Sequence, residues 1–97
     1  MKFHKDCFPI QTIIKDEKIM IVSGWIDETN TYGFYKYGKF WKATDLLSGT
    51  LICSCSTRKD CAEYVERNQC RLEEIRKTKK YLDKVETFRE EIKKKLK

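Results

Sequence analysis

Glycine and proline are scarce in this sequence, which has four glycines and one proline among its 97 residues. Neither residue occurs between positions 57 and 97, so no helix-breaking residue interrupts that segment. The four glycines are also too dispersed to form a phosphate-binding loop. The second half of the chain is therefore expected to be helical, and nothing indicates nucleotide chemistry.

Long hydrophobic runs are absent as well. The longest strictly apolar run covers residues 19–22, which is far too short to span a bilayer. The opening residues MKFHKDC contain no apolar segment of the kind found in signal peptides. We therefore expect a cytoplasmic protein, in which the five cysteines, an odd number, are reduced thiols.

Catalytic groups are few. Histidine occurs once, at position 4, so a cysteine–histidine pair would require the N-terminus to fold against a cysteine. Paired carboxylates occur as surface doublets such as Asp16-Glu17. One small domain also provides little material for a deep pocket. We expect no enzymatic activity and no cofactor.

Four soft ligands raise the question of a metal site, namely His4 and Cys7 together with Cys53 and Cys55. The single residue between Cys53 and Cys55 is atypical of structural zinc, where two or more residues separate the pair. Strand alternation places both thiols on one face, as small residues buried beneath a helix would be. We expect core cysteines and no metal site.

The first 56 residues indicate an antiparallel sheet. Apolar and β-branched runs predict strands at residues 10–15, 18–26, 32–37, 40–44 and 50–55, with Gly38-Lys39 as a two-residue type II′ turn. Thr57 then begins a helix as its N-cap, with Asp60 at the third position. The expected fold is α+β: a meander of about five strands packed by a helix (1–68), followed by a long basic amphipathic helical extension (69–97).

The helical segment carries two apolar stripes in different register. Such a shift predicts a break near residues 77–80, or a helix that changes partner face, and Asn68-Gln69 is a second place for a break. The second stripe consists of Tyr81, Val85, Phe88, Ile92 and Leu96. Either the helix folds back over this stripe or another chain covers it. We expect a homodimer formed through this helix.

The stretch TYGFYKYGKFWK, residues 31–42, holds six aromatic residues and three lysines. Alternation across the predicted hairpin assigns one face to the core, namely Tyr32, Phe34, Trp41 and Ala43. The other face is aromatic and cationic, and it could meet water or a partner. We expect the partner surface to comprise Tyr35, Tyr37, Lys39, Phe40, Lys42 and Thr44, with Arg58 and Lys59 from the start of the helix.

Residues 32–64 resemble the AP2-type DNA-binding domain and the similar arm-binding domains of tyrosine recombinases. The positions that fit are Trp41, Ala43, Asp45, Gly49, Ile52, Thr57 and Ala62, and Tyr64 lies near its expected place. The resemblance implies a three-stranded antiparallel sheet packed on a helix, with the sheet face in the DNA major groove. Family members read DNA with arginines on the sheet, whereas the first arginine of this chain is Arg58.

The net charge of +6 is concentrated in the second half. Residues 1–56 carry seven lysines and six acids, a net charge of +1, and residues 57–97 carry fourteen basic and nine acidic residues, a net charge of +5. The interleaved acids dilute attraction to phosphate. We therefore expect a small protein-interaction or inhibitory module, such as a phage or mobile-element accessory protein acting on a nucleic-acid enzyme, for example a defence nuclease. The alternative is a protein that binds DNA or RNA directly through the aromatic-lysine face and the basic helix.

Overall fold

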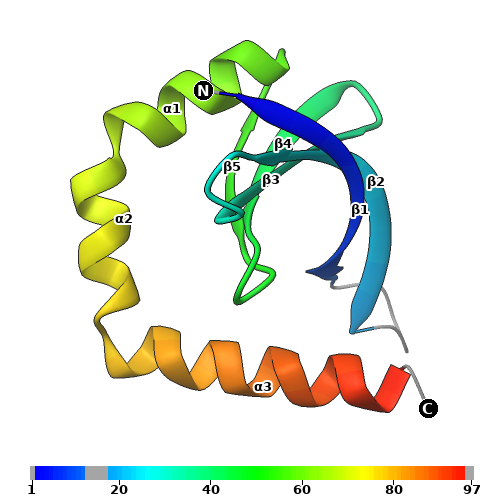
Figure 1. The fold of residues 1–97 in the computed structure, drawn as a ribbon, viewed down its shortest axis with the longest axis vertical. Coiled ribbons are helices and arrows are strands. Elements are labelled where there is room, and N and C mark those ends of the chain that lie inside the picture. Colours follow the sequence, from blue (N-terminus) through cyan, green and yellow to red (C-terminus); the bar gives the residue numbers. More distant parts are fainter. Residues whose placement is uncertain (1, 13–17, 96–97) are drawn as a thin grey trace.

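The computed structural model describes residues 2–12 and 18–95, and in these it contains five strands followed by three helices (Figure 1). The elements are β1 (Phe3–Gln11), β2 (Ile19–Asp27), β3 (Tyr32–Tyr37), β4 (Phe40–Asp45), β5 (Leu51–Cys55), α1 (Arg58–Arg67), α2 (Gln69–Arg76) and α3 (Lys79–Lys95). The strands form one antiparallel sheet in the order β1-β2-β3-β4-β5. The predicted α+β class and five-stranded meander are confirmed.

The register of the β3–β4 hairpin also agrees with the prediction. Tyr37 pairs with Phe40 and Tyr35 with Lys42, so the turn consists of two residues. Gly38, the first of them, has a φ of 63°, as a type II′ turn requires at that position. Turn chemistry and alternation therefore define this hairpin locally.

The first strand differs from the prediction. β1 begins at Phe3 and pairs along nine positions with β2, whereas the apolar pattern indicated a strand only from residue 10. Its first half is polar and exposed because β1 is an edge strand, and edge strands carry charge against aggregation. Residues 13–15 of the predicted strand, and the predicted turn at 16–17, lie outside the described residues.

Two apolar cores lie on opposite faces of the sheet. The larger core packs α1 against β3 and β4 and consists of Tyr32, Phe34, Ala43, Cys61, Ala62 and Val65. On the other face a smaller core consists of Phe8, Ile10, Ile26 and Tyr35. The long β1–β2 hairpin curves (Figure 1), and the backbone N–H of Gln11 donates to the Gly49 carbonyl at 2.9 Å. The curled sheet thus encloses the second core.

The sequence left two positions open for a break in the helical segment, and the segment breaks at both, which divides it into three helices. α1 begins after Thr57, whose hydroxyl accepts the backbone N–H of Asp60 at 3.1 Å, as predicted. It ends at Asn68, whose side-chain amide donates to the Tyr64 carbonyl at 2.8 Å. A polar side chain that bonds to the preceding turn competes with continuation of the helix. The chain then turns, and α2 begins at residue 69.

The second break centres on Thr78. Its hydroxyl donates to the Ile75 carbonyl at 2.6 Å and accepts the backbone N–H of Tyr81 at 3.2 Å. One side chain therefore both closes α2 and caps α3. Figure 1 shows the consequence: α1, α2 and α3 run along three successive sides of the sheet.

The third helix folds back onto its own chain. Tyr81, Val85 and Phe88 are buried, and the Phe88 ring lies against Gly49, where an added Cβ would overlap it. Gly49 also has a φ of 69°, a conformation that glycine adopts at little cost. At the far end the Lys95 ammonium donates to the Ile19 carbonyl at 2.8 Å.

The homodimer expectation therefore loses the reason given for it. It assumed that the stripe on α3 was unpaired, but Tyr81, Val85 and Phe88 are buried within the same chain, with Phe88 against Gly49 of the β4–β5 connection. Ile92 is half-buried, and Leu96 lies outside the described residues. Residues 79–95 consequently pack with the sheet. None of the helices in the described part of the chain is long and apolar enough to cross a membrane.

A buried carboxylate, Asp45, connects the sheet to α2 and α3. It accepts hydrogen bonds from the Arg76 guanidinium and the Tyr81 hydroxyl, each at 2.7 Å. The backbone N–H and the hydroxyl of Ser48 donate to it at 3.0 and 2.7 Å. Arg76 also lies over the Tyr32 ring, 4.9 Å from its centroid. This network fixes the two later helices beside the end of β4.

Another buried carboxylate, Asp27, organises the β2–β3 loop and makes stability dependent on pH. It accepts the backbone N–H groups of Thr31 and Tyr32 at 2.9 and 2.8 Å, and both the N–H and the hydroxyl of Thr29. Burial alone would raise the pKa of Asp27, but these hydrogen bonds outweigh burial and lower it below its usual value of 3.8. A carboxyl whose pKa is depressed by folding stabilises the protein above its unfolded-state pKa.

We therefore expect the free energy of unfolding to decrease as the pH falls below about 4 towards the folded-state pKa of Asp27. Asp27→Asn should reduce stability at pH 7 by about 1–2 kcal/mol and flatten this acid limb. Urea denaturation at pH 7 and pH 3 measures both effects. Glu28→Gln, at the exposed neighbouring position, is the control. An acid limb of unchanged steepness in Asp27→Asn would contradict the assignment.

Candidate partner-binding surface

The most exposed part of the predicted partner surface is the end of the β3–β4 hairpin, residues 36–42, here called the hairpin tip. Tyr37 and Phe40 pair across the turn and are 53% and 52% exposed. Lys36 and Lys39 are exposed, and Lys42 is half-buried. The sixteen residues from 29 to 44 include three lysines and no acidic residue. The hairpin tip is therefore an aromatic and cationic projection of the sheet (Figure 1).

Two residues expected on this exposed face are buried instead. Tyr35 is 6% exposed and packs edge-to-face on Phe8 with ring centroids 6.1 Å apart. Thr44 is 1% exposed, and its hydroxyl donates to the Thr50 carbonyl at 2.8 Å. The expectation that they face a partner is wrong because the β1–β2 hairpin curls over this face. The signal in the sequence was the pair of apolar residues Phe8 and Ile10, which need apolar side chains such as Tyr35 to pack against in a second core.

Arg58 also has a different environment from the one expected. Its guanidinium lies 5.0 Å from the ring centroid of Phe3, 4.8 Å from that of Trp25 and 6.0 Å from that of Trp41. Cation–π contacts of this kind hold the first turn of α1 on the sheet. Arg58 is half-buried, whereas its neighbour Lys59 is exposed. Lys59 therefore remains available to a partner, and Arg58 is engaged within the fold.

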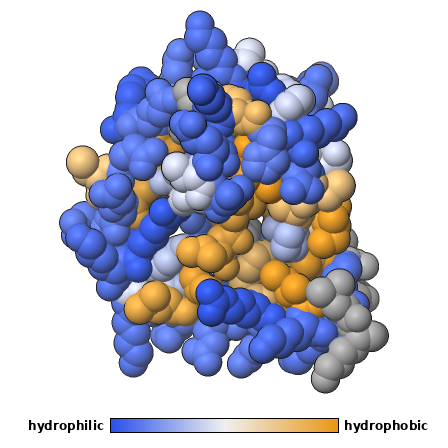
Figure 2. Space-filling view, in the orientation of Figure 1, coloured by the Kyte–Doolittle hydropathy of each residue, from blue (hydrophilic) through white to orange (hydrophobic). Residues whose placement is uncertain are grey.

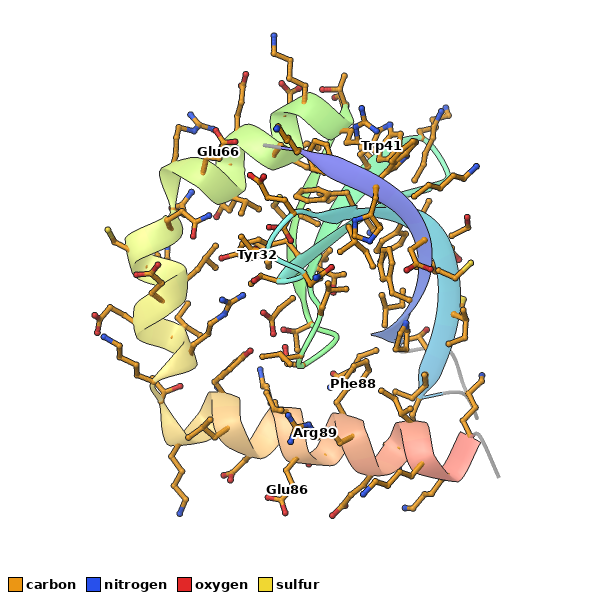
Figure 3. The ribbon with its side chains drawn as sticks, viewed as in Figure 1. Tyr32, Trp41, Glu66, Glu86, Phe88 and Arg89 are labelled. Atoms are coloured by element: carbon orange, nitrogen blue, oxygen red, sulfur yellow. The ribbon has the colours of Figure 1, made fainter. Side chains whose placement is uncertain are left out.

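A pocket of about 250 Å³ opens between the sheet and the three helices. Its wall includes the Asp45–Arg76 ion pair, and its lining includes Leu51 and Ile75, which are 55% and 44% exposed. Figure 2 shows apolar side chains gathered around the hollow of this face, with hydrophilic side chains around them. Figure 3 shows Tyr32 inside the frame of helices, with Phe88 directed towards the sheet and Glu86 away from it. The sequence did not indicate this pocket, because three strands and three helices contribute to its lining.

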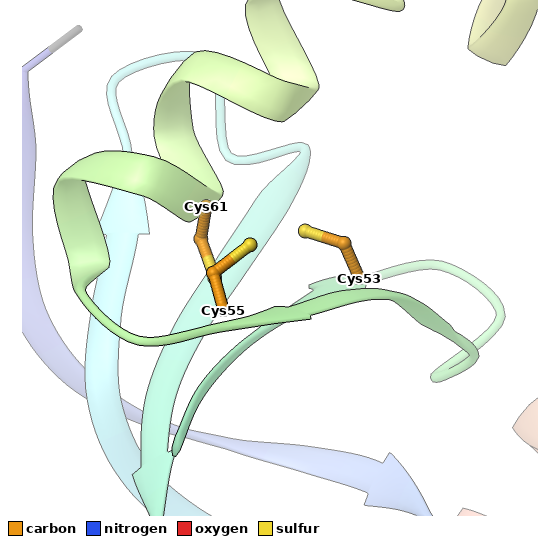
Figure 4. A group of neighbouring side chains, drawn as sticks. All are labelled: Cys53, Cys55 and Cys61. Atoms are coloured by element: carbon orange, nitrogen blue, oxygen red, sulfur yellow. The ribbon is translucent and has the colours of Figure 1, made fainter.

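Three cysteines come together beneath α1 (Figure 4). The sulfur atoms of Cys53, Cys55 and Cys61 all lie within 4.8 Å of one another. Strand alternation correctly predicted that Cys53 and Cys55 lie on one face beneath the helix, but it did not bring Cys61 to them. His4 and Cys7 are exposed on β1 and take no part in this cluster.

The three thiols are in a desolvated environment. Burial and the neighbouring thiol of Cys55 raise the pKa of Cys53 to about 11, and burial likewise raises the pKa of Cys61. The Cys61 thiol donates a hydrogen bond to the Trp41 carbonyl at 3.3 Å. At neutral pH Cys53 and Cys61 are therefore uncharged thiols, which are poor nucleophiles.

Comparison with known proteins identifies no relative of this chain. No family model, no curated protein and no solved structure matches this chain. The likeness to AP2-type domains thus rests on its sequence motifs. In the described residues β3, β4 and β5 are neighbouring strands, and α1 contacts all three. The opposite face, which that family applies to DNA, is covered here around Tyr35 by the β1–β2 hairpin.

Proposed function

We propose that this chain is a non-enzymatic protein-binding module that contacts an acidic surface of its partner through the hairpin tip. The observation that carries the proposal is the pair Tyr37 and Phe40, half-exposed side by side at a projecting turn. Aromatic side chains of this kind act as anchors at protein interfaces, where they bury large areas at a small cost in conformational entropy. A projecting pair of rings fits a concave site on the partner.

The lysines of the hairpin tip define the chemistry of that partner. Three lysines with no acid between residues 29 and 44 produce a local positive potential. Such a potential accelerates association with an acidic surface and disfavours basic partners. The module would therefore use its rings for affinity and its lysines for orientation.

The distribution of charge elsewhere favours a protein over nucleic acid. α1 carries three basic and three acidic residues, and α2 carries two of each, so neither helix is a positive track. α3 is more basic, with seven basic and four acidic residues, but its acids are interleaved with the bases. Proteins that bind single strands combine stacking with a continuous positive groove along the backbone. The basic residues at the hairpin tip number three, and all are lysines, which suit point contacts rather than bidentate readout of bases.

Direct nucleic-acid binding is the second candidate, because two adjacent exposed rings flanked by lysines could also stack on bases. It predicts binding to single-stranded oligonucleotides that weakens steeply with salt. Binding to a protein partner through two aromatic anchors predicts a much shallower salt dependence. The slope of affinity against salt concentration therefore separates the two candidates.

The double variant Tyr37→Ser with Phe40→Ser tests the proposal. Loss of two anchors should weaken partner binding at least about tenfold while leaving the melting temperature nearly unchanged, since both side chains are half-exposed. The assay is capture of the partner from a nuclease-treated lysate of the native host, followed by titration with the purified partner. Leu82→Ser, at a position 56% exposed on α3, is the matched control. A partner held equally well by the double variant would refute the role of the hairpin tip.

Charge reversal tests the second element of the proposal. Lys39→Glu should weaken binding and slow association several-fold at low salt, with a smaller effect at high salt. Lys93→Glu on α3 makes the same change in net charge at an exposed position far along the chain. An equal effect of both variants would show that net charge, rather than the hairpin tip, attracts the partner.

A further inference from the structure

The cysteine cluster formed by Cys53, Cys55 and Cys61 has a geometry that the protein-binding proposal does not use. Cys53 and Cys55 come from the same face of β5, and Cys61 comes from the first turn of α1 above them (Figure 4). The three sulfur atoms converge to within 4.8 Å of one another. Three sulfur ligands bonded at about 2.3 Å to one pyramidal centre lie roughly 3.5 Å apart, so each separation needs to contract by at most about 1.3 Å.

We propose that Cys53, Cys55 and Cys61 form a binding site for a soft ion that takes three sulfur ligands, with trivalent arsenic as its representative. Thiolate ligands select soft ions over hard ones. The scaffold is rigid, because β5 is held in the sheet by β4 and α1 packs directly on both strands. Little ordering is therefore required when the ion binds.

The surroundings favour an ion that leaves no net charge. The cluster belongs to the larger core, since Cys61 is fully buried in it and Cys53 and Cys55 pack against it. Arsenous acid supplies three hydroxyl groups: three As–S bonds form, three As–O bonds break, and the thiol protons leave with the hydroxyls as three water molecules. The product, an arsenic tris-thiolate, is neutral. A monovalent ion with three thiolates would instead carry a charge of −2 and release three protons, and buried charge is costly.

The site is also reachable from solvent. Cys53 and Cys55 are half-buried on β5, which is an edge strand of the sheet among the described residues, while Cys61 is fully buried above them. An incoming ion would meet the two strand thiols first and then the helix thiol. The remaining two cysteines, Cys7 and Cys70, are exposed and lie outside the cluster, so they provide an internal control.

The test is titration of the full chain with arsenite under argon, with a phosphine reductant present to exclude disulfides. We expect one arsenic atom per chain by intact mass, ultraviolet absorption from sulfur-to-arsenic charge transfer, and a drop in titratable thiols from five to two. The double variant Cys7→Ser with Cys70→Ser should bind equally well. Cys53→Ser and Cys55→Ser should each lower affinity at least tenfold. Both variants should remain folded because the two positions are half-buried, and circular dichroism checks this.

Three results would overturn the proposal. The first is no arsenic bound to the wild-type chain at micromolar arsenite. The second is undiminished arsenic binding in each of the single variants Cys53→Ser and Cys55→Ser, which would show that the remaining thiols suffice. The third is loss of binding in the Cys7→Ser with Cys70→Ser control. The cluster would then be a group of core thiols only.

Discussion

Replacement of Asp45 by asparagine is expected to lower the free energy of unfolding by about 3 kcal/mol, because it leaves the partly buried Arg76 without its counter-ion. Asp45 is 5% exposed, and its two oxygens accept four hydrogen bonds. An asparagine amide can accept on only one of its two terminal atoms. The Tyr81 hydroxyl, Ser48 and Arg76 would then compete for one oxygen.

Thermal and urea unfolding followed by circular dichroism measure this effect. For a chain of this length, a loss of about 3 kcal/mol corresponds to a decrease of at least about 10 °C in melting temperature. Asp83→Asn, at an exposed position on α3, makes the same chemical change and should alter stability by less than about 0.5 kcal/mol. Equal melting temperatures for Asp45→Asn and the wild type would show that the Asp45 network makes no net contribution to the free energy of unfolding.

A double-mutant cycle separates the ion pair from the rest of the network. Arg76→Met removes the cation while keeping much of the side-chain volume over Tyr32. If Asp45 and Arg76 act on each other, the double variant should lose clearly less stability than the sum of the two single variants. Additive losses would instead assign the effect of Asp45 to Tyr81 and Ser48.

Replacement of Phe88 by alanine is expected to destabilise the protein by about 3–5 kcal/mol, because it deletes a side chain that is 1% exposed at the centre of the contact between α3 and the sheet. The ring lies on Gly49, which offers no side chain to fill the space left behind. The cavity would lie between two elements, so α3 should loosen before the sheet does.

Hydrogen exchange of backbone amides gives the second readout for Phe88→Ala. Amides of α3 should exchange faster relative to those of β3 and β4, whereas uniform acceleration would indicate only a global loss of stability. The neighbouring variant Arg89→Ala, at an exposed position, is the control and should change stability by less than about 0.5 kcal/mol. If Phe88→Ala were as stable as this control, the packing of α3 on the sheet would be refuted.

The candidate binding surface was predictable in part, and the part that failed has a clear cause. Alternation identified Tyr37 and Phe40 as surplus to the core, and the turn chemistry of Gly38 placed them side by side. The same alternation assigned Tyr35 to the outside, although this residue is buried. A strand pattern reveals that two faces differ but does not reveal what lies over each face. Here the β1–β2 hairpin covers one of them.

The sequence by itself determined the features that depend on near neighbours. Side-chain alternation and one glycine specified the β3–β4 register, and Thr57 and Asn68 marked the two ends of α1. The absence of proline and glycine after residue 56 specified that the remainder is helical. These are local interactions, whose partners lie within a few positions along the chain, so their physical causes can be recognised without a fold.

Only the tertiary structure decided how the helices are placed and what they bring together. Whether the stripe on α3 folded back onto its own chain depended on the angles at the two breaks, which no spacing of residues encodes. Asp45 meets Arg76 and Tyr81 across 31 and 36 positions, and Cys61 reaches the strand thiols only because α1 crosses β5. Such contacts form because burial of apolar surface drives the elements together in one arrangement. The buried carboxylate network and the thiol cluster are products of that arrangement.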